Sequence, residues 1–222
     1  WNVKLMPIKV FQSTGQGNST NIAAGVEYAS SNGATIINMS FGSYAESSTL
    51  KLAMENAYAT SILVGAAGND QSCIGPSAIC PGFLPVAPMF PGSYSFVLGV
   101  EDSMGQYDNF DPDGPTNTAY GINSLLNYEL QAPGSSIMST IPGGGYAPLT
   151  GTSMATPLVA GGLALYNVQK PDDSNEIIFG NLINTSNIEI DLLAAIGIEP
   201  APDLKIISSV HRDTINSQNG NG

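Results

Sequence analysis

One short segment concentrates residue types that support nucleophilic chemistry. From Gly151 to Gly161 the sequence reads Gly-Thr-Ser-Met-Ala-Thr-Pro-Leu-Val-Ala-Gly, and it opens a helix predicted over Thr152 to Asn167. A serine hydroxyl is a weak nucleophile that needs an adjacent base. A helix start offers unpaired backbone N–H groups and a positive dipole end, which stabilise an oxyanion. Ser153 is therefore a candidate nucleophile, and the alternative is a serine that only caps the helix.

The whole segment resembles the nucleophile motif of the subtilisin-like serine endopeptidases, the subtilase family. That motif reads Gly-Thr-Ser-Met-Ala-Ser/Thr-Pro-His-Val-Ala-Gly, and the chain departs from it only at Leu158, where the family usually has histidine. The family histidine at this position is not the general base, so its loss does not by itself remove catalysis. The resemblance implies that Ser153 attacks peptide carbonyl groups.

A second segment, Ile62 to Asn69, resembles the family strand that leads into the asparagine of the oxyanion hole. The resemblance implies that the Asn69 amide and the Ser153 N–H together hold the developing oxyanion. Ala67 and Gly68 are expected to contribute to substrate binding. Without the serine motif, Asn69 would be interpreted as a turn residue after a strand.

A third segment, Ala34 to Gly42, is similar to the family pattern that ends in Ile-Asn-Met-Ser-Leu-Gly. By this resemblance, Ser40, Phe41 and Gly42 pair with the substrate backbone as an added strand and wall the specificity pocket. Phe41 replaces the usual leucine. The alternative is a buried strand end without a binding role.

The other two members of the catalytic triad are missing. The family order is Asp, His, Ser, so the aspartate strand and the histidine helix should precede Val3, and neither is in the sequence. The single histidine, His211, lies in the C-terminal tail and is expected to be exposed to solvent. The chain alone should be inactive. The catalytic Asp and His are expected upstream of this sequence, or on a cleaved N-terminal chain that stays associated. The alternative is that the protein has neither residue and is a pseudoprotease that acts as a binding or scaffolding module.

The elements that must position these residues alternate between strand and helix. Strands are predicted over Val3–Phe11, Thr35–Met39 and Ser61–Ala67, with helices between them that begin near Ser19–Asn21 and Leu50. Asn32-Gly33 supplies the stop of the first helix. This alternation implies a parallel sheet with crossover helices, whose strands present ligands at their carboxyl ends.

Later strands are expected over Ser95–Val100 and Tyr128–Gln131, and a last helix over Ser174–Asn184. The expected fold is therefore α/β, a subtilisin-like three-layer fold with a parallel sheet flanked by helices. It lacks the N-terminal strand and the catalytic-histidine helix. Residues 1–198 are expected to form a partial peptidase domain, and residues 199–222 a linker or the start of a further domain.

The composition indicates which classes of partner the protein can bind. Six Lys+Arg against eighteen Asp+Glu give a formal net charge of −12, which disfavours binding to nucleic acid. No apolar run is long enough to span a membrane. Polypeptide substrates are the expected partners, and a secreted or cell-surface location is expected.

Cys73 and Cys80 are interpreted as a local disulfide, with two free thiols as the alternative. No cofactor is expected for the chemistry. The family often binds structural calcium, but no ligand set can be assigned, since Asp108–Gly114 holds only a fragment of a calcium loop.

Overall fold

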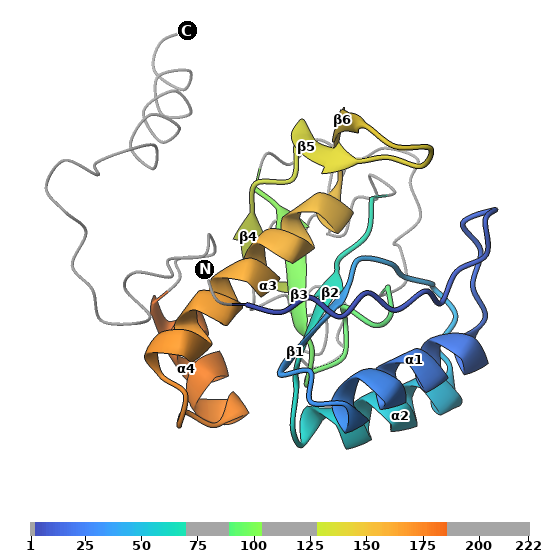
Figure 1. Ribbon diagram of the computed structural model, residues 1–222. Helices are drawn as coiled ribbons and strands as arrows, with labels where there is room; N and C mark the ends of the chain where they lie inside the picture. Colours follow the sequence, from blue (N-terminus) through green and yellow to red (C-terminus); the bar gives the residue numbers. More distant parts are fainter. Residues whose placement is uncertain (1–2, 70–88, 104–127, 186–222) are drawn as a thin grey trace, which may run out of the picture.

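The structure, a computed structural model, describes residues 3–69, 89–103 and 128–185 (Figure 1). Its centre is a four-stranded sheet in the order β1-β2-β3-β4, in which all neighbours run parallel. The strands are β1 Ile36–Met39, β2 Ile62–Ala66, β3 Leu98–Asp102 and β4 Tyr128–Ala132.

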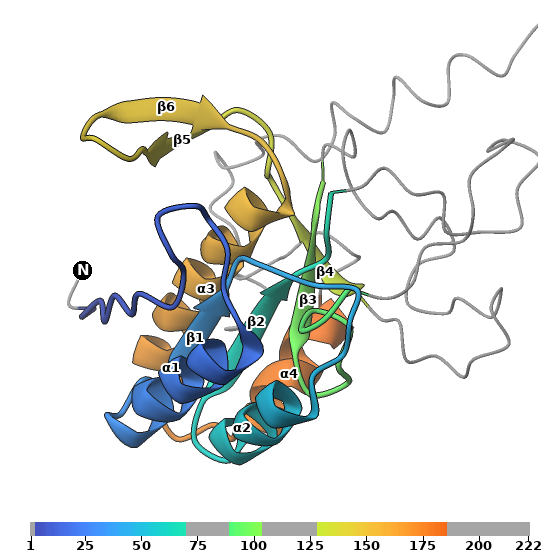
Figure 2. The ribbon, with the colours of Figure 1, turned by 90° about the vertical axis from the view of Figure 1, so that its right-hand side faces the viewer.

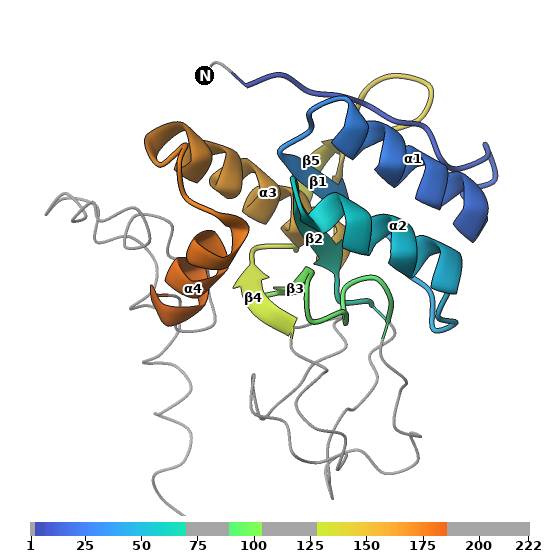
Figure 3. The same ribbon diagram turned by 90° about the horizontal axis from the view of Figure 1, so that it is seen from below.

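Two pairs of helices cover the two faces of this sheet (Figure 3). Helices α1 Ser19–Ser31 and α2 Ser48–Tyr58 lie on one face, and α3 Thr152–Gln169 and α4 Asn175–Thr185 lie on the other. An antiparallel hairpin of β5 Ile137–Thr140 and β6 Tyr146–Leu149 follows β4 and stands apart from the sheet (Figure 2). The predicted α/β class, with a parallel sheet between helices, is confirmed.

The strands alternate between two apolar cores because successive side chains of a strand point to opposite faces. Along β2, Ile62 and Val64 pack with α3 and α4, whereas Leu63 packs with α1 and α2. All five residues of β2 are buried, as expected for a central parallel strand with both faces covered. This rigid centre carries the loops that follow β1 and β2.

The prediction of a buried strand over Val3–Phe11 is wrong. The segment is extended, but it is not a strand, and most of its side chains are exposed. Within the described residues no backbone hydrogen bond joins residues 3–10 to any strand. Apolar, β-branched composition makes a strand only where a neighbouring strand accepts its backbone N–H and C=O groups.

The other predicted elements form with boundaries shifted by one to three residues. The first helix begins at Ser19 and is capped by Asn18, whose Oδ1 accepts the Asn21 N–H at 2.8 Å. It ends at Asn32-Gly33 as predicted, with Gly33 at φ +82°. The β5–β6 hairpin was not predicted.

Several predictions fall outside the described residues: the Cys73–Cys80 pairing, the Asp108–Gly114 loop, the tail with His211, and the linker from 199. Among the residues that the structure does describe, there is no helix of the length and apolar character that crossing a membrane requires.

Candidate active site

The site forms where the carboxyl ends of β1 and β2 meet the start of α3. Ser40 directly follows β1 in the sequence, and Asn69 lies in the loop that follows β2. Ser153 is the second residue of α3. The Ser153 Oγ donates a hydrogen bond to the Ser40 carbonyl oxygen at 3.1 Å. The structure therefore brings together Ser153 and the Ser40 segment, which lie 113 residues apart in the sequence.

The turn before α3 requires glycine at position 151. Gly151 has φ +144° and ψ 168°, a combination essentially confined to glycine. A Cβ at this position would lie 2.8 Å from the Asn69 Oδ1. Gly151 N–H donates to the Gly134 carbonyl oxygen at 2.9 Å. This close approach of backbone and amide is what places the start of α3 against the end of β2.

Asn69 caps α3 from a distant part of the chain. Its Oδ1 accepts the Thr152 N–H at 2.8 Å and lies 3.2 Å from the Thr152 Oγ1. Since the Thr152 N–H is a donor, the atom facing it must be the amide oxygen, and this fixes the orientation of the amide. The Nδ2 group is thereby left without a hydrogen-bond acceptor among the described residues, on a side chain that is exposed.

A second unpaired donor lies beside it. The Ser153 N–H belongs to the first turn of α3, and within the described ranges it has no hydrogen-bond acceptor. First-turn amides carry the positive end of the helix dipole. Two N–H donors near one hydroxyl suit the stabilisation of an oxyanion formed by attack of that hydroxyl.

Thr152 ties the two halves of the site together. It is fully buried, and its Oγ1 accepts the Gly68 N–H at 3.1 Å. Its carbonyl oxygen accepts the Thr156 hydroxyl at 2.7 Å. Gly68, at φ +114°, belongs to the turn that carries Asn69. Through Thr152, the turn after β2 and the first turn of α3 are joined by side-chain and backbone hydrogen bonds.

A buried carboxylate supports the turn from the opposite side, and the sequence reasoning missed it. Asp102, at the end of β3, is 2% exposed. Its two carboxylate oxygens accept the Gly134 N–H at 2.8 Å and the Ser135 hydroxyl at 2.7 Å. Gly134 in turn accepts the Gly151 N–H. The only signal in the sequence was an acidic residue at the end of an apolar strand.

The expected substrate wall, Ser40–Gly42, is held by its neighbours. The Asn38 side chain donates to the Ser40 Oγ at 2.9 Å, and Phe41 packs edge-on against Phe11. Just beyond, Ser43 and Phe90 exchange backbone hydrogen bonds of 2.8 and 2.9 Å. Gly42 lies directly against the Met89 side chain.

Ala67 differs from the other expected substrate-binding residues. It is fully buried, and its N–H donates to the Val100 carbonyl oxygen at 3.0 Å. Its side chain therefore belongs to the support of the turn and not to an open surface. Leu158 is 44% exposed on α3, so the residue that replaces the family histidine fills no buried polar site.

Neither a general base nor a metal site lies among the described residues. The described ranges contain no histidine, and they gather no group of three or more His, Cys, Asp or Glu side chains suited to a metal ion. Burial raises the pKa of Tyr94, so this hydroxyl stays protonated at neutral pH, as an ordinary tyrosine does. The described residues can present a hydroxyl and N–H donors, but they include no histidine to accept its proton.

The described residues thus combine a parallel α/β sheet with a serine at a helix start and unpaired N–H donors in the same region. Comparison with known proteins gives the family. The sequence profile of Peptidase S8, the subtilase family, matches residues 1–222, and the chain belongs to this family.

The chain is similar to two curated Bacillus proteases at the same identity. It is 36% identical to alkaline elastase YaB of Bacillus sp. (strain YaB) over 185 residues, which are 83% of this chain and 43% of that protein. It is also 36% identical to subtilisin DY of Bacillus licheniformis over 188 residues, which are 83% of this chain and 61% of that protein. The chain thus spans about half of the length of these relatives.

Solved structures agree with this placement. A protease from Pseudoalteromonas arctica PAMC 21717 superposes with a TM-score of 0.70 at 28% identity, covering 88% of this chain and 62% of that one. Sphericase superposes with a TM-score of 0.64 at 29% identity, covering 80% of this chain and 58% of that one.

Proposed function

We propose that the chain supplies the nucleophile half of a serine endopeptidase active site. The observation that carries the proposal is the convergence of the Ser153 hydroxyl, the Ser153 N–H and the oriented Asn69 amide at one end of the sheet. Membership of the subtilase family supports it. The Asp and His of the triad are expected on polypeptide that precedes Val3 or on an associated N-terminal chain.

The chemistry then follows from the groups present. The Ser153 Oγ attacks the carbonyl carbon of the scissile peptide while the triad histidine takes the hydroxyl proton. Negative charge moves to the carbonyl oxygen, where the Asn69 Nδ2 and the Ser153 N–H donate hydrogen bonds. The histidine returns the proton to the leaving amine, and water hydrolyses the acyl-enzyme. Extended substrate would pair with Ser40–Gly42.

The proposal also covers location and cofactors. A secreted or cell-surface protein is in keeping with the excess of carboxylates, eighteen Asp+Glu against six Lys+Arg. No cofactor enters the chemistry, and no step is assigned to calcium, for which the described residues offer no ligand cluster.

A fluorophosphonate probe, which reacts with activated serines, tests the proposal. On protein that contains the upstream Asp and His, the label should map to Ser153, and Ser153→Ala should abolish labelling. Asn69→Leu should slow labelling by about 100- to 1000-fold, as removal of one such donor does in subtilisin. The purified 222-residue chain alone should not hydrolyse casein, since it lacks the base.

A control variant distinguishes an effect on the Ser153 site from a general effect on folding. Thr60→Ala changes an exposed residue distant from Ser153 and should leave labelling unchanged. Label on another serine, or no label in the presence of the upstream segment, would replace the peptidase proposal with a pseudoprotease that binds or scaffolds. Casein hydrolysis by the 222-residue chain alone would overturn the assignment of the base to another segment.

A further inference from the structure

Residues 134–136, between β4 and β5, are bound to the turn that carries the nucleophile. The Gly134 carbonyl oxygen accepts the Gly151 N–H at 2.9 Å, and the Ser136 N–H donates to the Thr150 Oγ1 at 2.9 Å. The residues that lie two and three positions before the nucleophile are therefore both held by this connection.

The backbone of Ser136 has an unusual conformation. Its φ is +57°, and among the residues that the structure describes it is the only one other than glycine with a positive φ. Residues other than glycine rarely adopt this left-handed conformation, and those that do gather at functional sites, where the surrounding structure holds them. At Ser136 the conformation is held by the hydrogen bond to Thr150 and by the bonds of the two residues before it.

The Asp102 carboxylate holds those two residues. One of its oxygens accepts the Gly134 N–H at 2.8 Å, and the other accepts the Ser135 hydroxyl at 2.7 Å. A carboxylate that is buried, as this one is, costs free energy unless hydrogen bonds replace its water. Hydrogen bonds to a charged acceptor are also stronger than neutral ones. Asp102 therefore fixes the position of Gly134 more firmly than a neutral acceptor would.

Gly134 lies between this carboxylate and the nucleophile turn and touches both. A Cβ added to Gly134 would lie 2.8 Å from the Asp102 Cγ and 2.8 Å from the Gly151 carbonyl oxygen. These distances leave no room for a side chain, so the Gly134 backbone is packed directly against both groups. A shift of the carboxylate is therefore passed to Gly151, which lies two residues before Ser153.

We propose that Asp102 is a positioning residue for the Ser153 nucleophile and acts through Gly134 and Gly151. The inference rests on the proposed function, because it concerns the rate at which Ser153 attacks a carbonyl group. Attack requires the reacting atoms to lie within a narrow range of distances, and a misplacement of about 1 Å can lower a rate by about 100-fold. The role assigned to Asp102 is to keep the hydroxyl within that range.

The expected substrate wall, Ser40–Gly42, is held by different contacts. They come from the Asn38 side chain, the Phe11 ring and the Met89 side chain. Loss of the Asp102 carboxylate should therefore slow the attack by the nucleophile without weakening the binding of substrate. This separation distinguishes a positioning residue from one that only stabilises the fold.

The test uses protein that contains the upstream Asp and His. Asp102→Ala should lower both kcat for casein hydrolysis and the rate of fluorophosphonate labelling at Ser153 by about tenfold or more, and should change KM for casein by less than about twofold. Asp102→Asn should restore both rates to within about threefold of the natural protein. Its amide oxygen can accept the Gly134 N–H while its NH2 group donates to the Ser135 hydroxyl oxygen.

Asn175→Ala controls for a general loss of stability. The Asn175 side chain on α4 donates to the Tyr58 and Ser61 carbonyl oxygens at 2.6 and 3.2 Å, so this variant also breaks two hydrogen bonds. It should lower the midpoint of urea unfolding, as Asp102→Ala does, but leave kcat and labelling unchanged. If Asp102→Ala does not fold, Asp102→Glu takes its place. That variant keeps the charge but carries the carboxylate one methylene further, and it should slow labelling by about tenfold as well.

Several results would overturn the positioning role and leave the proposed function in place. They are Ser153 labelling that Asp102→Ala does not slow, equal slowing by Asn175→Ala, a rise in KM in place of a fall in kcat, and no recovery in Asp102→Asn. Absence of label at Ser153 in the natural protein would instead refute the proposed function, and the positioning role with it.

Discussion

The turn around Ser153 and the outer edge of β1 differ in how many hydrogen bonds the rest of the described chain makes to them. At the turn, hydrogen bonds converge from β1, β2 and β3 and from the loop after β4. At the outer edge of β1, Ile36 and Asn38 present backbone groups to a cavity that the described chain does not fill. Both regions belong to the same sheet, yet the described residues hydrogen-bond only one of them on all sides.

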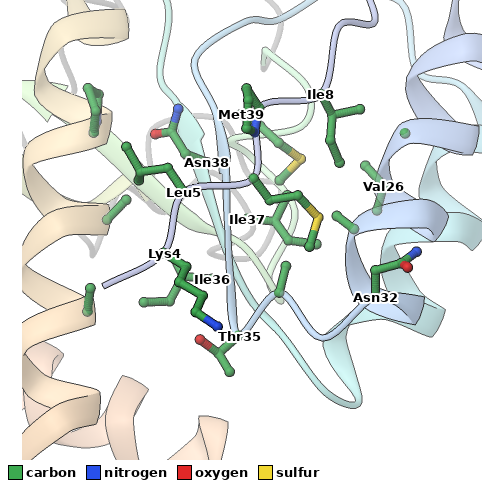
Figure 4. Close-up of a pocket in the computed structure, with 18 of the residues that line it drawn as sticks. Lys4, Leu5, Ile8, Val26, Asn32, Thr35, Ile36, Ile37, Asn38 and Met39 are labelled. Carbon is green, nitrogen blue, oxygen red and sulfur yellow. The ribbon is translucent and has the colours of Figure 1, made fainter. Parts of the chain in front are cut away.

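This difference shows which parts of the candidate site are held in place by contacts within the described chain. The donors around Ser153 owe their geometry to contacts within the chain, so they are preorganised before any substrate or partner arrives. The cavity beside β1 instead has Leu5, which is 91% exposed, among its lining residues (Figure 4).

The largest expected effect is at Gly151. Gly151→Ala should destabilise the chain by about 3–4 kcal/mol, because alanine is strained at this φ and its Cβ would displace the Asn69 amide. Gly143→Ala is the matched control, with φ +86° but no atom within 4 Å of its Cβ, and should cost about 1–2 kcal/mol. Urea unfolding measures both, and equal losses would show that the Asn69 contact is unimportant.

Removing the buried carboxylate should have the next largest effect. Asp102→Ala leaves the Gly134 N–H and the Ser135 hydroxyl without their acceptor, at a cost of about 2–3 kcal/mol. Asp102→Asn keeps one acceptor oxygen and should lose less. Hydrogen exchange at Gly151 should accelerate along with that at Gly134. If only Gly134 responds, the support does not reach the nucleophile turn.

A smaller effect is expected from the hydroxyl of Thr152. Thr152→Val keeps the shape and the backbone N–H but removes the acceptor for the Gly68 N–H, for a loss of about 1–2 kcal/mol. Thr152→Ser restores the hydroxyl and should recover most of the stability. A Thr152→Val chain as stable as the natural one would mean that the backbone bond to Asn69 suffices.

The smallest effect should be at the cavity beside β1. Leu5→Ala should change the free energy of unfolding of the chain by no more than about 0.5 kcal/mol, since the Leu5 side chain is exposed. Thermal unfolding measures the change. A large loss would show that Leu5 packs against the cavity wall.

The sequence predicted the regular elements better than the contacts between them. Periodicity and the Asn32-Gly33 stop placed α1 and β2 nearly correctly, and the motif around Ser153 placed that residue at the start of α3. The strand expected over Val3–Phe11 failed because a strand depends on a partner that local composition does not reveal. Asp102 was missed because its role depends on burial and on Gly134, which lies 32 residues away.

The cap of α3 also has a consequence for the order of folding. Helices usually begin on a local side chain, as α1 does on Asn18. Gly151 provides none, and the first amide of α3 is satisfied by Asn69, 83 residues earlier in the chain. That turn of helix can be secured only after β2 and its loop are in place, because its first amide depends on a partner far away in the sequence. We therefore expect Ser153 to reach its final position later in folding than a residue in a locally capped helix such as α1.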